Sequence, residues 1–210
     1  MLLARMIMMV LVVLTVSSSC TKDEENKEEE EKEMKHFSDI IRAEDIAVLK
    51  KKGMQLYEGT NPPIINGVYK LAPWRLDFAD PIKNKTIGDI SESGVVLEVS
   101  EQTSGRSSVK VKSLYGYQEI HKKDPQSISG SGDNFTLTYT VWITTGPGSL
   151  WAYPFAVFIS GTKDGEILKN IQMATVGLYR EAPTDEYDFS VEGDVTIYSD
   201  VDGISKGVTP

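Results

Sequence analysis

The sequence predicts an antiparallel all-β domain with one helix in front of it, and three observations support this prediction. First, residues 134–144 alternate apolar and polar side chains with a period of two, as a strand between two different environments does. Second, two segments rich in β-forming residues are separated by Lys163-Asp164-Gly165, and Asp-Gly is a favoured type I′ hairpin turn. Third, the remaining body holds short strand-like segments with turn residues between them, and no second helical pattern.

The chain opens with the features of an exported protein. Residues 6–16 are an apolar run with one threonine, and they are too short for a membrane span, which needs about 20 apolar residues. Three serines, 17–19, then precede Cys20, the single cysteine of the chain. This order resembles a bacterial lipoprotein signal, with Ser17 where that family usually has leucine. The resemblance implies that residues 1–19 are removed and that Cys20 carries a diacylglycerol; the alternative is a plain secretory signal with a spare thiol.

Residues 20–36 are almost entirely charged, with eight acids and four lysines. Because this segment lacks apolar side chains, it cannot offset the entropy cost of ordering, and we expect a solvated tether. Acidic residues just after the cysteine, here residues 23–25, also resemble the surface-export signal of Bacteroidetes lipoproteins. That resemblance implies an outer-membrane lipoprotein exposed at the cell surface; the alternative is a spacer that carries no address.

The charge balance and the cysteine count narrow the possible partners. The chain has 31 acidic and 22 basic residues, a net charge of −9. This balance argues against nucleic acid, which is bound through Lys and Arg on phosphates, and against a polybasic lipid-binding patch. One cysteine allows no intrachain disulfide and no thiolate zinc cluster. We therefore expect one domain over residues 37–210, attached to a membrane only through the lipid on Cys20.

A helix is predicted over residues 38–52. Ser38 is a natural N-cap, three lysines suit the negative C-terminal end of the helix dipole, and Gly53 is the expected stop. The apolar positions form a loose stripe. We expect this stripe to pack on the β domain through Ile46 and Leu49.

The rest of the body is predicted to consist of strands joined by tight turns. Ser104-Gly105 and Gly193-Asp194 are turn candidates, and Pro73 separates the first two strands. Successive hairpins indicate a meander, which closes as a barrel or folds as a sandwich. A helix leading into residues 67–69 is similar to the start of a lipocalin-type barrel, which favours a barrel over a jelly-roll sandwich. The predicted strands are 67–71, 75–78, 94–99, 108–112, 134–144, 154–160, 166–178, 187–191 and 195–199.

Four segments spread across the body, 53–73, 127–139, 158–174 and 195–205, resemble blocks of a family of uncharacterised Bacteroidetes lipoproteins. Their order along the chain is a stronger signal than any one of them. The resemblance implies a secreted, lipid-anchored β domain. It supplies no activity, so no functional residue follows from it.

Catalytic and metal-binding motifs are not found in the sequence. There is no G-x-S-x-G nucleophile elbow and no H-E-x-x-H zinc motif, and the two histidines are His36 in the tether and His121 at an expected strand end. We therefore expect a protein that is not an enzyme, and we nominate no catalytic, cofactor or metal residue.

A fragment of a calcium loop, D-x-D-G, begins at Asp200. An EF-hand loop needs an oxygen ligand at its first position and glutamate at its twelfth, where this chain has Tyr198 and Thr209. We therefore interpret the fragment as a turn after a strand. A looser calcium site at Asp200 and Asp202 stays open.

Three aromatic residues are the candidate ligand contacts. Trp142 lies on the threonine face of segment 134–144, which should be the wetter face. Residues 144–150 are expected to form a loop that leads to Trp151 and Tyr153. Aromatic rings beside polar loops stack on sugars, whereas the alternative role is core packing. The predicted function is a glycan or small-ligand binding module. The alternative is a structural or protein-interaction lipoprotein that docks an envelope partner.

Overall fold

The computed structural model describes residues 40–80, 86–92, 94–103, 110–114, 119–120, 126–144, 152–178 and 193–207. These ranges belong to one compact unit, Lys35–Pro210. The expectations for the leader, for Cys20, for the acidic tether and for segment 145–150 lie outside the described residues. The same holds for the Ser104-Gly105 turn, His121, strand 187–191 and Trp151.

The helix, α3, spans Ala43–Lys51 and is shorter than the expected 38–52. The prediction that helix begins at Ser38 is wrong, because Arg42 is extended, with φ −69° and ψ 153°, and caps the helix instead. The Arg42 guanidinium donates two hydrogen bonds, of 2.9 and 3.0 Å, to the carboxylate of Asp45 in the first helical turn. The predicted stop is confirmed: Gly53 has φ 96°, a left-handed conformation that favours glycine.

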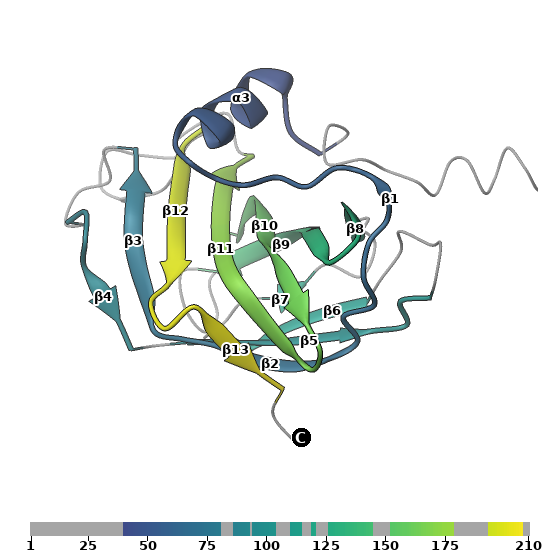
Figure 1. The fold of residues 1–210 in the computed structure, drawn as a ribbon. Helices are drawn as coiled ribbons and strands as arrows, with labels where there is room; N and C mark the ends of the chain where they lie inside the picture. Colours follow the sequence, from purple (N-terminus) through teal and green to yellow (C-terminus); the bar gives the residue numbers. More distant parts are fainter. Residues whose placement is uncertain are drawn as a thin grey trace, which may run out of the picture. The chain divides into compact units, whose positions relative to one another are not determined.

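The large sheet contains ten strands (Figure 1). The strands β8 (Ser127–Ser131), β9 (Asn134–Thr144), β10 (Ala152–Asp164), β11 (Ile167–Gly177) and β12 (Val195–Asp200) form the predicted antiparallel meander. The short strand β1 (Thr60–Asn61) pairs with β8 in parallel. Two further strands, β13 and β7, pair with β11 and β9. In spatial order the main path is β1 (Thr60–Asn61), β8 (Ser127–Ser131), β9 (Asn134–Thr144), β10 (Ala152–Asp164), β11 (Ile167–Gly177), β12 (Val195–Asp200), β3 (Trp74–Ala79) and β4 (Ile90–Ser91), with β13 (Ile204–Lys206) and β7 (Glu119–Ile120) beside it.

A second sheet contains β2 (Gly67–Leu71), β5 (Val95–Ser100) and β6 (Lys110–Leu114). In Figure 1 its strands run across the direction of β3 and β12. Within the described ranges, the backbone pairing that connects it to the large sheet is one isolated bridge, between Tyr69 and Gly207 just after β13.

The fold is therefore all-β and sandwich-like, and the preference for a closed lipocalin-like barrel is wrong. The chain changes sheets between β2 and β3, at Pro73, whose nitrogen has no hydrogen to continue a ladder. The two ends of the large sheet are the short strands β1 and β4. Because these two strands do not pair with each other, the sheet does not close into a barrel.

The hairpin between β10 and β11 is confirmed, with its turn one residue later than predicted. Asp164 pairs with Ile167, so Gly165 and Glu166 are the central turn residues. Gly165 has φ 60°, and of these two residues only Gly165 has a positive φ. A glycine at the first central position is the requirement of a type II′ turn rather than the Asp-Gly type I′ turn.

Two apolar cores lie on opposite faces of the large sheet. Strand β10 shows the division, because Phe155, Val157 and Ile159 join the core between the sheets, whereas Ala156 and Phe158 join the core under α3. Strand β10 carries apolar side chains on both of its faces, because one face lies against the second sheet and the other lies under α3. We call these two clusters the inter-sheet core and the helix-side core.

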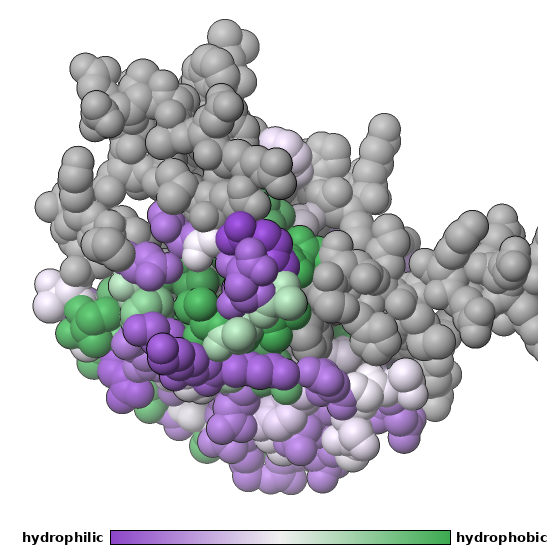
Figure 2. Space-filling view, turned by 90° about the horizontal axis from the view of Figure 1, so that it is seen from above, coloured by the Kyte–Doolittle hydropathy of each residue, from purple (hydrophilic) through white to green (hydrophobic). Residues whose placement is uncertain are grey.

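The packing of α3 on the domain is as predicted. Leu49 is completely buried in the helix-side core, and Ile46 packs against that core while remaining partly exposed. Figure 2, which looks down on this side of the molecule, shows hydrophobic residues between hydrophilic ones. The helix is thus a part of the folded body, and burying one such leucine contributes about 1.5–3 kcal/mol.

Gln102 joins the segment before β2 to the end of β5. Its side-chain Oε1 accepts a hydrogen bond of 2.8 Å from the Ile65 N–H, and its Nε2 donates one of 2.8 Å to the Pro63 carbonyl. Its backbone N–H and carbonyl pair with the side-chain amide of Asn66. A buried glutamine therefore satisfies backbone groups of a segment that has no strand partner for them.

Candidate functional site

The threonine face of β9 is buried, which corrects the expectation that it is the wetter face. The alternation itself is confirmed, since Phe135, Leu137 and Tyr139 lie in the inter-sheet core. On the other face the exposed fractions are 0% for Thr136, 1% for Thr138 and 8% for Thr140. The physical reason is that segments earlier in the sequence than β9 cover this face.

A row of polar side chains crosses four strands on the helix side. Ser129 pairs with Thr136, Thr136 with Ser160, and Ser160 with Gln172, so β8, β9, β10 and β11 each contribute one residue. Residues 53–59, which we call the strap, run from α3 towards β1 (Figure 1) and contact every member of this row.

The polar row supplies hydrogen-bond partners to the backbone of the strap. The Tyr57 N–H donates to Thr136 Oγ1 at 2.7 Å, and Ser129 Oγ donates to the Tyr57 carbonyl at 2.8 Å. The Gln55 N–H donates to Gln172 Oε1 at 2.9 Å. Because the strap is not a sheet strand here, its peptide groups need these side chains. The hydroxyl group of Thr136 on β9 therefore binds the strap rather than solvent.

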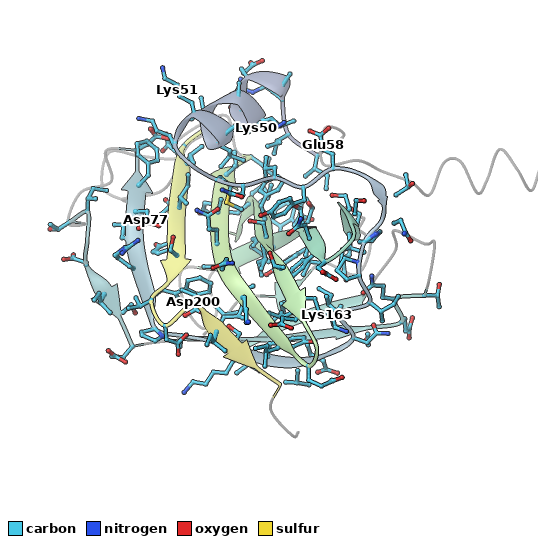
Figure 3. All side chains as sticks on the ribbon, in the orientation of Figure 1. Lys50, Lys51, Glu58, Asp77, Lys163 and Asp200 are labelled. Carbon is cyan, nitrogen blue, oxygen red and sulfur yellow. The ribbon has the colours of Figure 1, made fainter. Side chains whose placement is uncertain are left out.

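The strap is also tied to the helix. Lys50 Nζ and Glu58 Oε1 form an exposed ion pair of 2.9 Å between the last turn of α3 and the end of the strap (Figure 3). Exposed pairs of this kind contribute at most about 1 kcal/mol. The main attachment of the strap is accordingly the polar row.

Trp142 lies at the far end of the same face of β9. It pairs with Pro154 on β10 and with Glu119 on β7. Trp142 and Pro154 are partly exposed, as is Leu178, whose N–H donates to the Pro154 carbonyl at 3.1 Å. The ring thus lies at the margin of a buried face, beside two other partly exposed apolar residues.

Thr140 is the buried residue of this face that comes just before Trp142 along β9. It pairs with Ala156, and its Oγ1 is buried without a hydrogen-bond partner among the residues that the structure describes. A buried hydroxyl of this kind is uncommon. The sequence offers no signal for it, because threonine is an ordinary strand residue.

The register does not make Tyr153 the cross-strand neighbour of Trp142. Tyr153 pairs with Ile143, one residue away from the Trp142 pairing. Trp151 and segment 145–150 lie outside the described ranges. Of the three aromatic residues nominated from the sequence, Trp142 is the one whose side-chain environment the structure describes.

The D-x-D-G segment is a turn after a strand, as interpreted from the sequence. Asp200 ends β12, and its Oδ2 accepts a hydrogen bond of 2.9 Å from Ser205 Oγ. Asp202 is exposed, and its Oδ1 accepts a 3.0 Å bond from the Ile204 N–H within the turn. No group of three or more His, Cys, Asp or Glu residues that could hold a metal ion occurs in the described part of the chain.

The carboxyl group of Asp200 is in an unusual environment. Its pKa is raised to about 6: burial raises it most, the Ser205 hydrogen bond lowers it, and the neighbouring Asp202 carboxylate raises it. Burial is the main cause, because the charged form loses its hydration. The carboxyl group of Asp200 is therefore poorly suited to carry a charge at this position.

No family model, curated protein or solved structure matches the chain. Among the described residues, there is no helix with the length and apolarity that a membrane crossing requires. Function is accordingly inferred from the chain's own residues.

Proposed function

We propose that the protein is a lipid-anchored envelope protein that binds a glycan or another small polar ligand at the face around Trp142. The observation that supports this most directly is the partial exposure of Trp142, at the end of a strand face whose three threonines are buried. A large ring at such a margin offers apolar area to a ligand, and tryptophan stacks well on the flat apolar face of a sugar ring.

The backbone around Trp142 supports a binding role because it is held in place. Strand β9 pairs with β10 along its whole length, from Asn134 to Thr144. A ring mounted on a paired strand loses little additional freedom when a ligand binds. Pro154 and Leu178, both partly exposed, extend the apolar surface beside the ring.

The membrane attachment in this proposal depends on Cys20. An apolar run, three serines and a single cysteine occur in the order that lipoprotein processing uses, and a charged segment follows. Two acyl chains on one cysteine hold a protein stably at a bilayer, since each buried CH₂ contributes about 0.8 kcal/mol. The acidic residues 23–25 favour the outer, surface-exposed position.

A saccharide array probed with residues 37–210 tests the binding proposal. Saccharide signals that saturate with protein concentration support it. If the array gives no saccharide signal and a cell-envelope protein is captured reproducibly, the protein is instead a docking lipoprotein.

Attachment is tested separately by metabolic labelling with a fatty acid. The wild type should incorporate the label and sediment with membranes, whereas Cys20→Ala should do neither. A Cys20→Ala variant that stays membrane-bound, with an unlabelled wild type, contradicts the anchoring proposal.

A further inference from the structure

We infer that Trp74 and Asp200 together bind one hydroxyl group, supplied by a water molecule or by the alcohol of a ligand, between β3 and β12. This inference rests on residues remote in register from Trp142 and does not depend on the proposed function. Asp200 and Trp74 are direct cross-strand partners. Both side chains are more than nine-tenths buried, with exposed fractions of 8% and 3%.

Each residue of this pair has one polar atom without a partner. Trp74 Nε1 and Asp200 Oδ1 are buried, and within the described residues neither atom makes a hydrogen bond of ordinary geometry, although the Asp200 carboxyl group lies close to the backbone and carboxylate of Asp202. Leaving a buried donor or acceptor unsatisfied costs about 1–3 kcal/mol, so two such atoms on directly opposed residues need a common explanation. One atom is a donor and the other is an acceptor.

Neighbouring contacts hold both side chains in place. Asp200 Oδ2 is engaged by Ser205 Oγ at 2.9 Å, which fixes the carboxyl group and leaves Oδ1 pointing elsewhere. The Trp74 ring packs edge-on against Tyr198, with ring centres 6.5 Å apart and planes at 61°. The N–H of Val201 donates to the Pro73 carbonyl at 3.0 Å, which ties the two chain segments together beside the pair. Figure 3 shows Asp200 where β12 leads into the turn before β13.

The chemistry of the two atoms selects the bound group. The group must accept a hydrogen bond from the indole N–H and donate one to the carboxylate oxygen. A metal cation or an ammonium group cannot accept from the indole, and an anion is opposed by Asp200 and by nearby Asp202. A hydroxyl oxygen performs both functions. A buried water typically makes about three hydrogen bonds to otherwise unsatisfied groups, and an alcohol can do the same with its single O–H.

Solution NMR of the full ¹⁵N-labelled chain tests this assignment through the Trp74 indole N–H, which is identified by its loss in Trp74→Phe. We expect a cross-relaxation signal between this indole proton and a long-lived bound water, together with slow exchange. If glycerol or glucose instead shifts the Trp74 indole signal saturably and removes the water signal, the hydroxyl comes from an alcohol. Either result supports the site. An indole proton that shows neither effect overturns it.

Two matched variants distinguish loss of the proposed hydroxyl-binding site from a general disturbance of the turn after β12. Asp200→Leu removes the acceptor and should abolish the water or alcohol signal at Trp74, whereas Asp202→Asn, at an exposed position, should retain it. The wild-type measurement stands even if Asp200→Leu does not fold. A crystal structure with a direct hydrogen bond between Trp74 Nε1 and Asp200 Oδ1 also overturns the inference.

Discussion

The backbone N–H of Tyr57 donates a 2.7 Å hydrogen bond to Oγ1 of Thr136, which lies 79 residues later in the chain. This bond attaches the strap to the middle of the large sheet. The carbonyl oxygen of Tyr57 accepts a hydrogen bond from Ser129 Oγ on the next strand, so both backbone polar groups of Tyr57 are held. The strap therefore closes the helix-side face through polar contacts, next to the apolar contacts of α3.

We expect Thr136→Val to destabilise the protein. Valine has the shape of threonine but cannot accept a hydrogen bond, so the Tyr57 N–H loses its partner. An unsatisfied backbone donor at this position should lower the free energy of unfolding by about 1–3 kcal/mol. Urea denaturation followed by circular dichroism measures the change.

Thr140→Val is the matched control, on the same strand and the same face. The Oγ1 of Thr140 is buried and has no partner within the described ranges, so its removal should be neutral or stabilising. If both substitutions cost the same, the stabilising role assigned to the Thr136–Tyr57 bond is wrong.

Leu49→Ala tests whether α3 is part of the folded body. Leu49 is completely buried in the helix-side core, and replacing a buried leucine by alanine typically costs about 2–5 kcal/mol. Thermal melts should show a clearly lower Tm. Ala47→Gln, at an exposed position of the same helix, should change the Tm little. Equal melting temperatures for Leu49→Ala and the wild type would show that the helix does not unfold together with the rest of the domain.

Gln102→Ala should destabilise the junction between β5 and the segment before β2. The substitution leaves the Ile65 N–H and the Pro63 carbonyl without their partners. The expected loss is about 2–3 kcal/mol, close to that of other buried polar networks. Thr103→Ala, at the adjacent exposed position, is the control and should stay within about 0.5 kcal/mol of the wild type.

The raised pKa of Asp200 predicts a specific pH dependence of stability. The folded state binds this proton more tightly than the unfolded state does, because the pKa rises from its ordinary value of 3.8 to about 6. The contribution of Asp200 to the unfolding free energy is therefore greatest at low pH. It falls as the pH rises through this window and is constant above it.

Asp200→Asn removes this titration and supplies the reference. The stability of the variant relative to the wild type should increase from about pH 4 to about pH 6 and then level off. Denaturation curves of both proteins at several pH values measure the difference. A difference that does not change with pH would show that the carboxyl group of Asp200 titrates alike in the folded and unfolded states.

Local patterns made much of the fold predictable. Strand β9 was predictable to its end residues because apolar and polar residues alternate along it, with Trp142 as the one large apolar residue on the threonine side. The β10–β11 hairpin was predictable because Gly165 permits the tight turn between two β-rich segments. Leu49 was predictable as a core residue because it lies on the apolar side of a short helix.

Contacts between distant segments were not predictable in the same way. The burial of Thr136 depends on Tyr57, and no local pattern reports a hydrogen bond across 79 positions. The choice of a sandwich over a barrel depends on which sheet β3 joins after Pro73, which is a question of long-range pairing. The helix start moved to Ala43 because the Arg42–Asp45 contact and the extended Arg42 outweigh the capping preference of Ser38.

The candidate site likewise has one feature that a local sequence pattern predicts and others that depend on contacts between distant segments. The position of Trp142 on the threonine face followed from parity alone. Its partly exposed apolar neighbours Pro154 and Leu178 come from two other segments and are brought beside it by the register. The pairing of Trp74 with Asp200 could not be foreseen, because the two residues lie far apart in sequence and meet only through the β3–β12 register.

The most direct test of the proposed function is a paired measurement on Trp142→Ala: saccharide binding on an array and stability by urea denaturation. Replacing a partly exposed binding residue should cost well below the about 3–5 kcal/mol of a buried tryptophan, for which Trp74→Ala is the comparison. The account predicts that Trp142→Ala stays folded and loses the saccharide signals of the wild type. A variant that binds saccharides as the wild type does, or that unfolds as readily as Trp74→Ala, would contradict it.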